Sequence, residues 1–199
     1  MKKLIGTVLA SFCLTSLMAQ DIVMDGPDGK LQLAVFASSE ANPVYSIVYN
    51  GKTMLEKSPL GMTTNIGDFT KGMKLTGHSV TPIDTIYGQN RIKTLQIHYR
   101  ANELICNFEN PKGQKMNVTF RIGNNDVAFR YSLPRQNGKG SVTVTAEETG
   151  FRLPQQTTTF LCPQSDAMIG WKRTKPSYEE EYKADAPMSE RSQYGHGYT

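Results

Sequence analysis

The sequence predicts an all-β protein, folded as an antiparallel β-sandwich. Short segments with strand-like alternation recur at spacings of roughly ten residues, and clusters of Gly, Pro, Asn and Asp separate them. Helical periodicity is almost absent, and strands do not alternate with helices as they would around a parallel sheet. Together these observations favour two antiparallel sheets packed face to face.

The strongest strand signals come early in the chain. A turn over residues 25–30 precedes residues 31–36, where apolar and polar side chains alternate with the period of two of a half-buried strand. Residues 44–49 form a second strand-like segment after a polar loop. Asn50 and Gly51 then predict a tight hairpin, because a two-residue type I′ turn needs positive φ at both positions.

The middle of the chain continues this pattern with one interruption. Between residues 58 and 77 a proline and several glycines separate the apolar side chains, which predicts a connection that crosses between the sheets. Further strands are predicted over residues 78–83, 91–100, 104–109, 115–122, 127–133 and 141–145. After Pro154 strand pairing is less evident, and we expect an irregular segment with one helical turn over residues 177–183.

The first 19 residues predict a cleaved signal peptide. Two lysines precede an apolar run over residues 4–18, and Ala19 supplies a small residue before the expected cut. The run is shorter than the roughly 20 residues of a membrane span, although an uncleaved anchor is the alternative. We therefore expect a periplasmic or secreted protein without a membrane span, with a sandwich domain over residues 20–163 and an irregular segment over residues 164–199.

Charge and cysteine content exclude several kinds of site. The formal net charge of +4 falls to +2 without Lys2 and Lys3, which gives no basic surface for nucleic acid. Nucleotide binding is not supported, since no Gly-rich phosphate loop follows a strand. Zinc is not expected with three histidines and no C-x-x-C spacing. Cys106 and Cys162 lie in apolar, strand-like segments and are interpreted as two buried free thiols, with a disulfide between them as the alternative.

The segment from Trp171 to Tyr182 has the composition of a binding site. It combines the only tryptophan with three cationic side chains, two tyrosines and three consecutive glutamates. Trp171 is a candidate sugar-stacking platform, or else a plug at the edge of the core. His196, between two glycines, is a second candidate substrate-binding side chain. The adjacent glutamates point apart, so they are not the facing pair of a glycoside hydrolase; one could ligate calcium, or all three could form a solvated acidic turn.

Several short motifs resemble, in order and spacing, the N-terminal domain of glycoside hydrolase family 97. They are Asp25-Gly-Pro-Asp-Gly-Lys30, Tyr45-Ser-Ile-Val-Tyr-Asn-Gly51, Ser58-Pro-Leu-Gly61, Phe129-Arg-Tyr131, Glu148-Thr-Gly-Phe-Arg-Leu-Pro154 and Tyr178-Glu179-x-x-Tyr182. The resemblance covers essentially the whole chain after the signal peptide. It implies an exported enzyme with an N-terminal β-super-sandwich of the galactose-mutarotase type, a central (β/α)8 barrel and a small C-terminal β domain.

The resemblance also implies a division of labour within such an enzyme. Members are α-glucosidases or α-galactosidases, and the inverting α-glucosidase branch depends on calcium. The Tyr-Glu-x-x-Tyr match makes Glu179 the glutamate that this domain contributes to the calcium site. The catalytic carboxylates belong to the barrel, so no residue of this chain is assigned as catalytic, and the chain alone is expected to be inactive. Its expected partners are an oligosaccharide and the barrel of its own parent chain.

A second interpretation remains open. Trp171, the nearby tyrosines and the export signal also suit a secreted carbohydrate-binding sandwich that acts alone, without catalysis. The chain ends after a Gly- and Tyr-rich stretch without a closing strand, which favours a cut within a longer protein over a native terminus.

Overall fold

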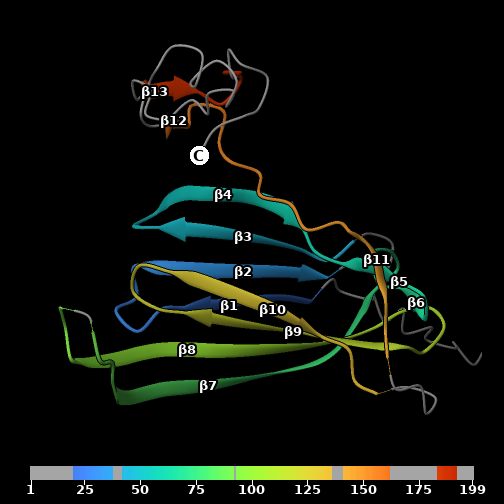
Figure 1. The fold of residues 1–199 in the computed structure, drawn as a ribbon. Coiled ribbons are helices and arrows are strands. Elements are labelled where there is room, and N and C mark those ends of the chain that lie inside the picture. Colours follow the sequence, from blue (N-terminus) through green and yellow to red (C-terminus); the bar gives the residue numbers. More distant parts are fainter. Residues whose placement is uncertain (1–19, 38–41, 92, 136–140, 162–182, 192–199) are drawn as a thin grey trace, which may run out of the picture.

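A computed structural model describes residues 20–37, 42–91, 93–135, 141–161 and 183–191. Every regular element in these ranges is a β-strand, which confirms the all-β class and its antiparallel sheets (Figure 1). The strands are β1 (Gln20–Asp25), β2 (Leu31–Ala37), β3 (Val44–Tyr49), β4 (Lys52–Pro59), β5 (Met62–Thr64), β6 (Gly67–Asp68), β7 (Lys74–Gly88), β8 (Gln96–Glu109), β9 (Lys115–Ile122), β10 (Val127–Ser132), β11 (Val144–Glu147), β12 (Thr158–Leu161) and β13 (Lys183–Pro187). Across the described ranges, no helix has the length and apolar character needed to span a bilayer.

The first sheet has the order β1-β2-β3-β4, with all neighbours antiparallel. Its centre is β2, where Leu31, Leu33 and Val35 are buried and alternate with half-buried residues, as the sequence predicts. The hairpin between β3 and β4 is also confirmed. Asn50 has φ 48° and Gly51 has φ 76°, the pair of positive values that a type I′ turn requires.

The second sheet has the order β10-β9-β8-β7 and corrects one prediction. Residues 91–100 and 104–109 were expected as separate strands, yet residues 96–109 form the single strand β8. The polar residues between them stay extended because both neighbours hold them: Asn102 is paired with β7 on one side and with β9 on the other. Its side chain also donates a 2.7 Å hydrogen bond to the Asp25 carbonyl in β1.

The segment over residues 58–77 is more regular than the sequence predicts. It contains β5 and β6, which form a three-stranded sheet of order β11-β5-β6. The interrupted apolar residues predict only a connection, because a strand signal within this segment is weak. The strand that pairs with β5 is β11, which lies roughly 80 residues away in sequence. The predicted strand at 141–145 lies at Val144–Glu147 instead.

The chain beyond Pro154 also contains regular structure. β12 pairs with β13, and the second of these lies within the segment expected to be irregular. The predicted helical turn over residues 177–183 falls largely outside the described ranges, and Lys183 begins β13.

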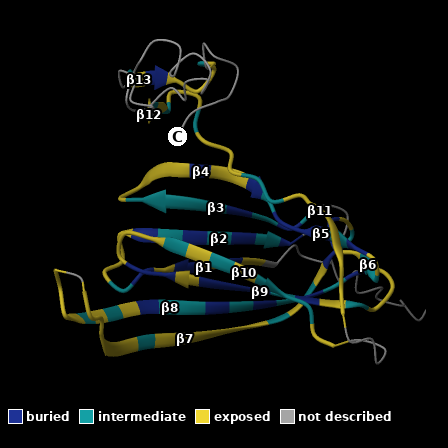
Figure 2. Cartoon of the chain, in the orientation of Figure 1, coloured by how far each residue is buried: buried dark blue, intermediate teal, exposed yellow. Residues whose placement is uncertain are grey.

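The hydrophobic core lies between the two four-stranded sheets. β1 faces β8 and β2 faces β9, so the inner side chains of four strands meet. Figure 2 shows buried positions along β2, β8 and β9. The largest fully buried side chains are Tyr45, Phe69, Phe108, Phe120, Leu33, Leu60, Met73, Leu104, Met116, Ile122, Val35 and Val118. Cys106 is a buried free thiol, as predicted, and burial raises its pKa to about 12.

Candidate functional site

The residues that the sequence singles out for ligand contact lie outside the described part of the chain. This holds for the metal candidate Glu179 and for the substrate-binding candidates Trp171 and His196. Cys162 lies outside it as well. Over the ranges that are described, no group of three His, Cys, Asp or Glu side chains could hold a metal ion.

Three of the family-like motifs meet on one side of the sandwich. Residues 148–152 run antiparallel to residues 56–61 and bond to them through the backbone. Gly150 N–H donates to the Pro59 carbonyl at 3.0 Å, and Glu148 N–H donates to the Gly61 carbonyl at 2.9 Å. Arg152 N–H donates to the buried Ser58 hydroxyl at 2.9 Å. The motifs at residues 58–61 and 148–154 therefore form a single structural unit, although about 90 residues separate them in sequence. The third motif, which contains Tyr131, joins them through side chains.

A hydrogen-bonded chain crosses this unit from backbone to carboxylate. Gly61 N–H donates to the Tyr131 hydroxyl at 3.0 Å. The Thr149 hydroxyl donates to Glu147 Oε1 at 2.6 Å and lies 2.8 Å from the Tyr131 oxygen. Because the single Thr149 hydrogen is already committed to Glu147, Tyr131 is the donor to Thr149. Burial raises the pKa of Tyr131, so the phenol remains protonated and keeps this donor role.

Aromatic rings line the inner side of the same unit. Phe129 stands at the centre, with ring centroids 5.5 Å from Tyr45, 5.6 Å from Phe120 and 6.4 Å from Phe151. The Tyr45 hydroxyl donates to the Gly150 carbonyl at 3.2 Å, and burial raises its pKa to about 12. Phe151 differs from the others because 66% of it is exposed. The cluster thus continues from the core to an open apolar surface.

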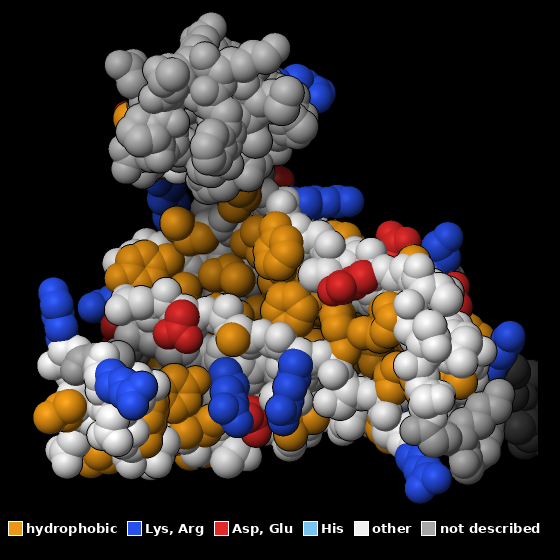
Figure 3. All heavy atoms as spheres, viewed as in Figure 1, with side chains coloured by type: hydrophobic (Ala, Val, Ile, Leu, Met, Phe, Trp, Pro, Cys, Tyr) orange, Lys and Arg blue, Asp and Glu red, His pale blue; other side chains and the backbone are white. Residues whose placement is uncertain are grey.

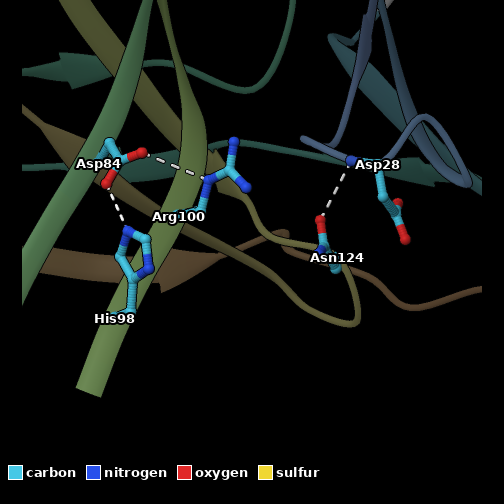
Figure 4. Close-up of polar contacts among 5 residues, drawn as sticks. All are labelled: Asp28, Asp84, His98, Arg100 and Asn124. Atoms are coloured by element: carbon cyan, nitrogen blue, oxygen red, sulfur yellow. Dashed lines mark hydrogen bonds and ion pairs between the residues drawn. The ribbon is translucent and has the colours of Figure 1, made fainter. Parts of the chain in front are cut away.

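A second polar group lies on the long β7–β8 hairpin. Asp84 of β7 contacts two side chains of β8, His98 Nε2 at 2.5 Å and Arg100 Nε at 3.4 Å (Figure 4). The hydrogen bond from His98 is the main reason why the pKa of Asp84 lies below its usual range. All three side chains are more than half exposed, so the group is a surface brace between two strands.

A pocket of about 450 Å³ opens at the end of the sandwich. The apolar side chains come from β2, β3, β4 and β10, and two polar residues come from the β9–β10 turn. They are Leu31, Ile47, Tyr49, Met54, Val127, Asn125 and Asp126. A hydrogen bond joins this turn to the turn between β1 and β2, where Asp28 N–H donates to Asn124 Oδ1 at 3.2 Å (Figure 4). A pocket of this size and composition suits an apolar or amphipathic occupant.

Comparison with known proteins identifies relatives along most of the chain. A "Probable retaining alpha-galactosidase" of Streptomyces bingchenggensis is 30% identical over 136 residues, which are 68% of this chain and 20% of that protein. A "Retaining alpha-galactosidase" of Bacteroides thetaiotaomicron is 28% identical over 160 residues, which are 79% of this chain and 23% of that protein.

Solved structures resemble the fold as well. The "Crystal structure of beta-arabinopyranosidase" is 75% identical, with a TM-score of 0.79 over 90% of this chain and 29% of that one. A glycoside hydrolase family 97 enzyme from Pseudoalteromonas sp. strain K8, solved in complex with panose, is 25% identical, with a TM-score of 0.65 over 72% of this chain and 22% of that one. This chain therefore spans between 20% and 29% of the length of these relatives.

The family model described as "Glycosyl-hydrolase 97 N-terminal" matches residues 24–199, which are most of the 199-residue chain. Its reach includes the three motifs that meet around Tyr131. The chain belongs to the N-terminal domain family of glycoside hydrolase family 97.

Proposed function

We propose that this chain is the N-terminal scaffold domain of an exported glycosidase that hydrolyses α-galactosides or β-arabinopyranosides. The observation that carries this proposal is the 75% identity to a β-arabinopyranosidase, which far exceeds the identity to the other relatives. The catalytic carboxylates lie outside this chain, and the domain supports the substrate cleft of the parent enzyme.

The two substrate names describe one stereochemical class. The ring hydroxyl groups of β-L-arabinopyranose have the same arrangement as those of α-D-galactose, and arabinose lacks only the exocyclic hydroxymethyl group. A site that bonds these ring hydroxyls discriminates strongly against a sugar with one hydroxyl inverted, since its own polar groups are then left unpaired. Panose contains α-linked glucose, so α-glucosides are the second candidate class through the 25% identical relative.

Rates on matched substrates test the proposed specificity. We expect the full-length protein to hydrolyse 4-nitrophenyl α-galactoside or β-L-arabinopyranoside with a kcat/KM at least about a hundredfold above that for the α-glucoside. The ratio of the first two substrates reports how the cleft treats the hydroxymethyl group. Preference for the α-glucoside would overturn the assignment.

We also propose that Glu179 contributes to a calcium site shared with the rest of the parent enzyme. The support is the Tyr-Glu-x-x-Tyr motif within a chain that belongs to the family. Calcium takes six to eight oxygen ligands, so one carboxylate supplies only a part of its coordination. The other calcium ligands would come from outside the described ranges, in which no three His, Cys, Asp or Glu side chains lie together.

Export is the remaining part of the proposal. Its support is the leader over residues 1–19, with two lysines before the apolar run and Ala19 at the expected cleavage point. The mature protein is expected to begin at Gln20 and to occur in the periplasm or medium. Intact-mass analysis of the protein from its native source checks this, and a retained leader would contradict it.

A further inference from the structure

We infer that the second edge of β10, which pairs with none of the described strands, accepts one more antiparallel β-strand, which comes from the parent enzyme outside these 199 residues and lies beneath β4. The inference rests on the proposed function only in taking this chain to be part of a longer enzyme. It concerns an interaction surface of the sandwich and is independent of the substrate.

The two sheets are offset by one strand. β1 faces β8 and β2 faces β9, so continuing the order places β3 opposite β10. β10 is the last strand of its sheet, whereas the first sheet continues to β4. Among the described strands, none of the second sheet lies opposite β4, so one further strand beside β10 would face it.

The backbone of β10 is prepared for another partner. Gly123 N–H donates to the Asp126 carbonyl at 2.9 Å, so Gly123 and Asp126 form a hydrogen-bonded pair at the start of the β9–β10 hairpin. Along an antiparallel hairpin, hydrogen-bonded and non-hydrogen-bonded pairs then alternate. Ala128 and Arg130 then exchange hydrogen bonds with β9, while the amides of Phe129 and Tyr131 point to the free edge. Unpaired amides along a regular edge are the template to which an added strand binds.

The surface beside this edge is apolar, and we call it the β10 groove. It runs from the 450 Å³ pocket, past Phe129, to the exposed ring of Phe151. Figure 3 shows hydrophobic side chains gathered in this hollow between β3–β4 and β10. Met54, at 45% exposure, hangs over the groove from β4, and Tyr49 and Ile47 of β3 form its wall. A monomeric domain seldom leaves such a continuous apolar surface open to water.

The edge also lacks the features that protect exposed edge strands. β10 contains no proline, and its register with β9 is regular from Val127 to Ser132, without a bulge. Its one charged residue, Arg130, faces away from the groove because side chains alternate along a strand. An unprotected edge beside an apolar groove indicates a surface that is covered in the complete protein.

The occupant follows from the size of the relatives. This chain spans at most 29% of their length, so most of each related protein lies outside the corresponding region and can supply the strand. The strand should carry apolar side chains at alternate positions, facing β4, Met54 and Phe151. Side chains between them should be polar, because they share the outer face with Arg130.

Hydrogen exchange on the full-length protein tests the added strand, with a control inside β10. A bare edge gives alternating protection, with slow exchange at Ala128 and Arg130 and fast exchange at Phe129 and Tyr131. An added strand protects all four amides, and we expect the last two to exchange at least about a hundredfold more slowly than in an unstructured peptide. Alternating protection would overturn the inference.

Charged substitutions at neighbouring β4 positions provide the second test. Met54→Glu places a carboxylate in the groove, whereas Thr53→Glu places it on the opposite, exposed face. With a strand beneath β4, Met54→Glu should lower the Tm of the full-length protein by more than about 3 °C and Thr53→Glu by about 1 °C or less. Equal effects would overturn the inference. Neither outcome depends on which glycoside is cleaved, so the substrate proposal stands or falls separately.

Discussion

At the scale of single residues, Tyr131 joins two motifs that are far apart in sequence. Its hydroxyl accepts from Gly61 N–H and donates to Thr149, which in turn donates to Glu147. Removing this oxygen leaves a buried amide without an acceptor and a hydroxyl without its donor. Such a loss costs more than the net value of one hydrogen bond, because a desolvated group stays unpaired.

Tyr131→Phe is therefore expected to destabilise the domain by about 1–3 kcal/mol. Chemical denaturation of the wild-type and variant proteins measures the change in the free energy of unfolding. Tyr87→Phe is the matched control, because the Tyr87 hydroxyl has no hydrogen bond within the described residues and 41% of the side chain is exposed. Similar effects of the two substitutions would contradict the role of the Tyr131 hydroxyl.

Gly61 is required for two independent reasons. Its φ of 132° is disfavoured for any side chain, and an added Cβ would lie 2.5 Å from the Phe69 carbonyl oxygen. Gly29 also has positive φ, at 74°, but an added Cβ would meet nothing within 4 Å. Gly61→Ala should cost roughly 3 kcal/mol or more, against about 1 kcal/mol for Gly29→Ala. Thermal unfolding of both variants checks this, and equal shifts in Tm would refute the steric argument.

The proposed role of Glu179 as a calcium ligand is tested by substitution, with the adjacent Glu180 as the control. In the full-length protein, Glu179→Gln removes a charged oxygen ligand and should weaken calcium binding by about tenfold or more, measured by calorimetry. Glu180→Gln makes the same charge change one position along and should leave the affinity within about twofold. Unchanged calcium affinity in the Glu179 variant would end its assignment as a ligand.

At the scale of elements, the β7–β8 hairpin is joined by its long backbone ladder more than by its charges. The strands pair from Lys74 to Gly88, and Asp84 is held by His98 and Arg100 at the exposed end. Exposed ion pairs contribute little, because water screens the charges and the side chains lose freedom. The ladder and the neighbouring strand β9 therefore set the stability of this element.

Asp84→Asn should consequently leave the midpoint of chemical denaturation nearly unchanged near neutral pH, because the ion pairs it removes are exposed to water. The pKa of Asp84 lies below its usual range, so its contribution is present above the unfolded-state pKa and is lost as pH falls through the folded-state value. Denaturation of both proteins in neutral and strongly acidic buffer checks this. The difference between them should shrink in acid, and a difference that grew in acid would contradict the sign.

At the scale of the whole molecule, the chain corresponds to one part of its longer relatives. It belongs to the N-terminal family of glycoside hydrolase family 97 and spans at most 29% of the length of its relatives. Its described residues form a packed sandwich, a hydrogen-bonded unit in which Tyr131 joins Gly61 to Thr149, and the apolar β10 groove. These features agree with the scaffold role that we propose for the chain.

The 199-residue chain alone should therefore hydrolyse neither aryl α-galactosides nor aryl β-L-arabinopyranosides, whereas the full-length protein should hydrolyse at least one of them. Measured release of 4-nitrophenol from equal molar amounts compares the two. Circular dichroism must show β-structure in the isolated chain for the comparison to count. Turnover by a folded isolated chain would place catalytic residues inside it and refute the division of labour.

Much of the fold was predictable because its signals are local. Alternation identified β2, β3, β9 and β10, and the Asn50-Gly51 turn identified the hairpin between β3 and β4. The candidate ligand residues Trp171, Glu179 and His196 remain predictions, since they lie outside the described residues. Their proposed roles depend on a resemblance and on groups beyond this chain.

By itself, the sequence determined the all-β class, most strand positions, the turn at Asn50-Gly51 and the family resemblance. Each of these depends on residues within a few positions of one another, where side-chain alternation and backbone preference act directly. Only the tertiary structure decided that β8 is one strand, that β5, β6 and β11 form a sheet, and that Gly61, Tyr131 and Thr149 meet. These depend on pairing between distant segments, and local side-chain patterns do not encode which edges will meet.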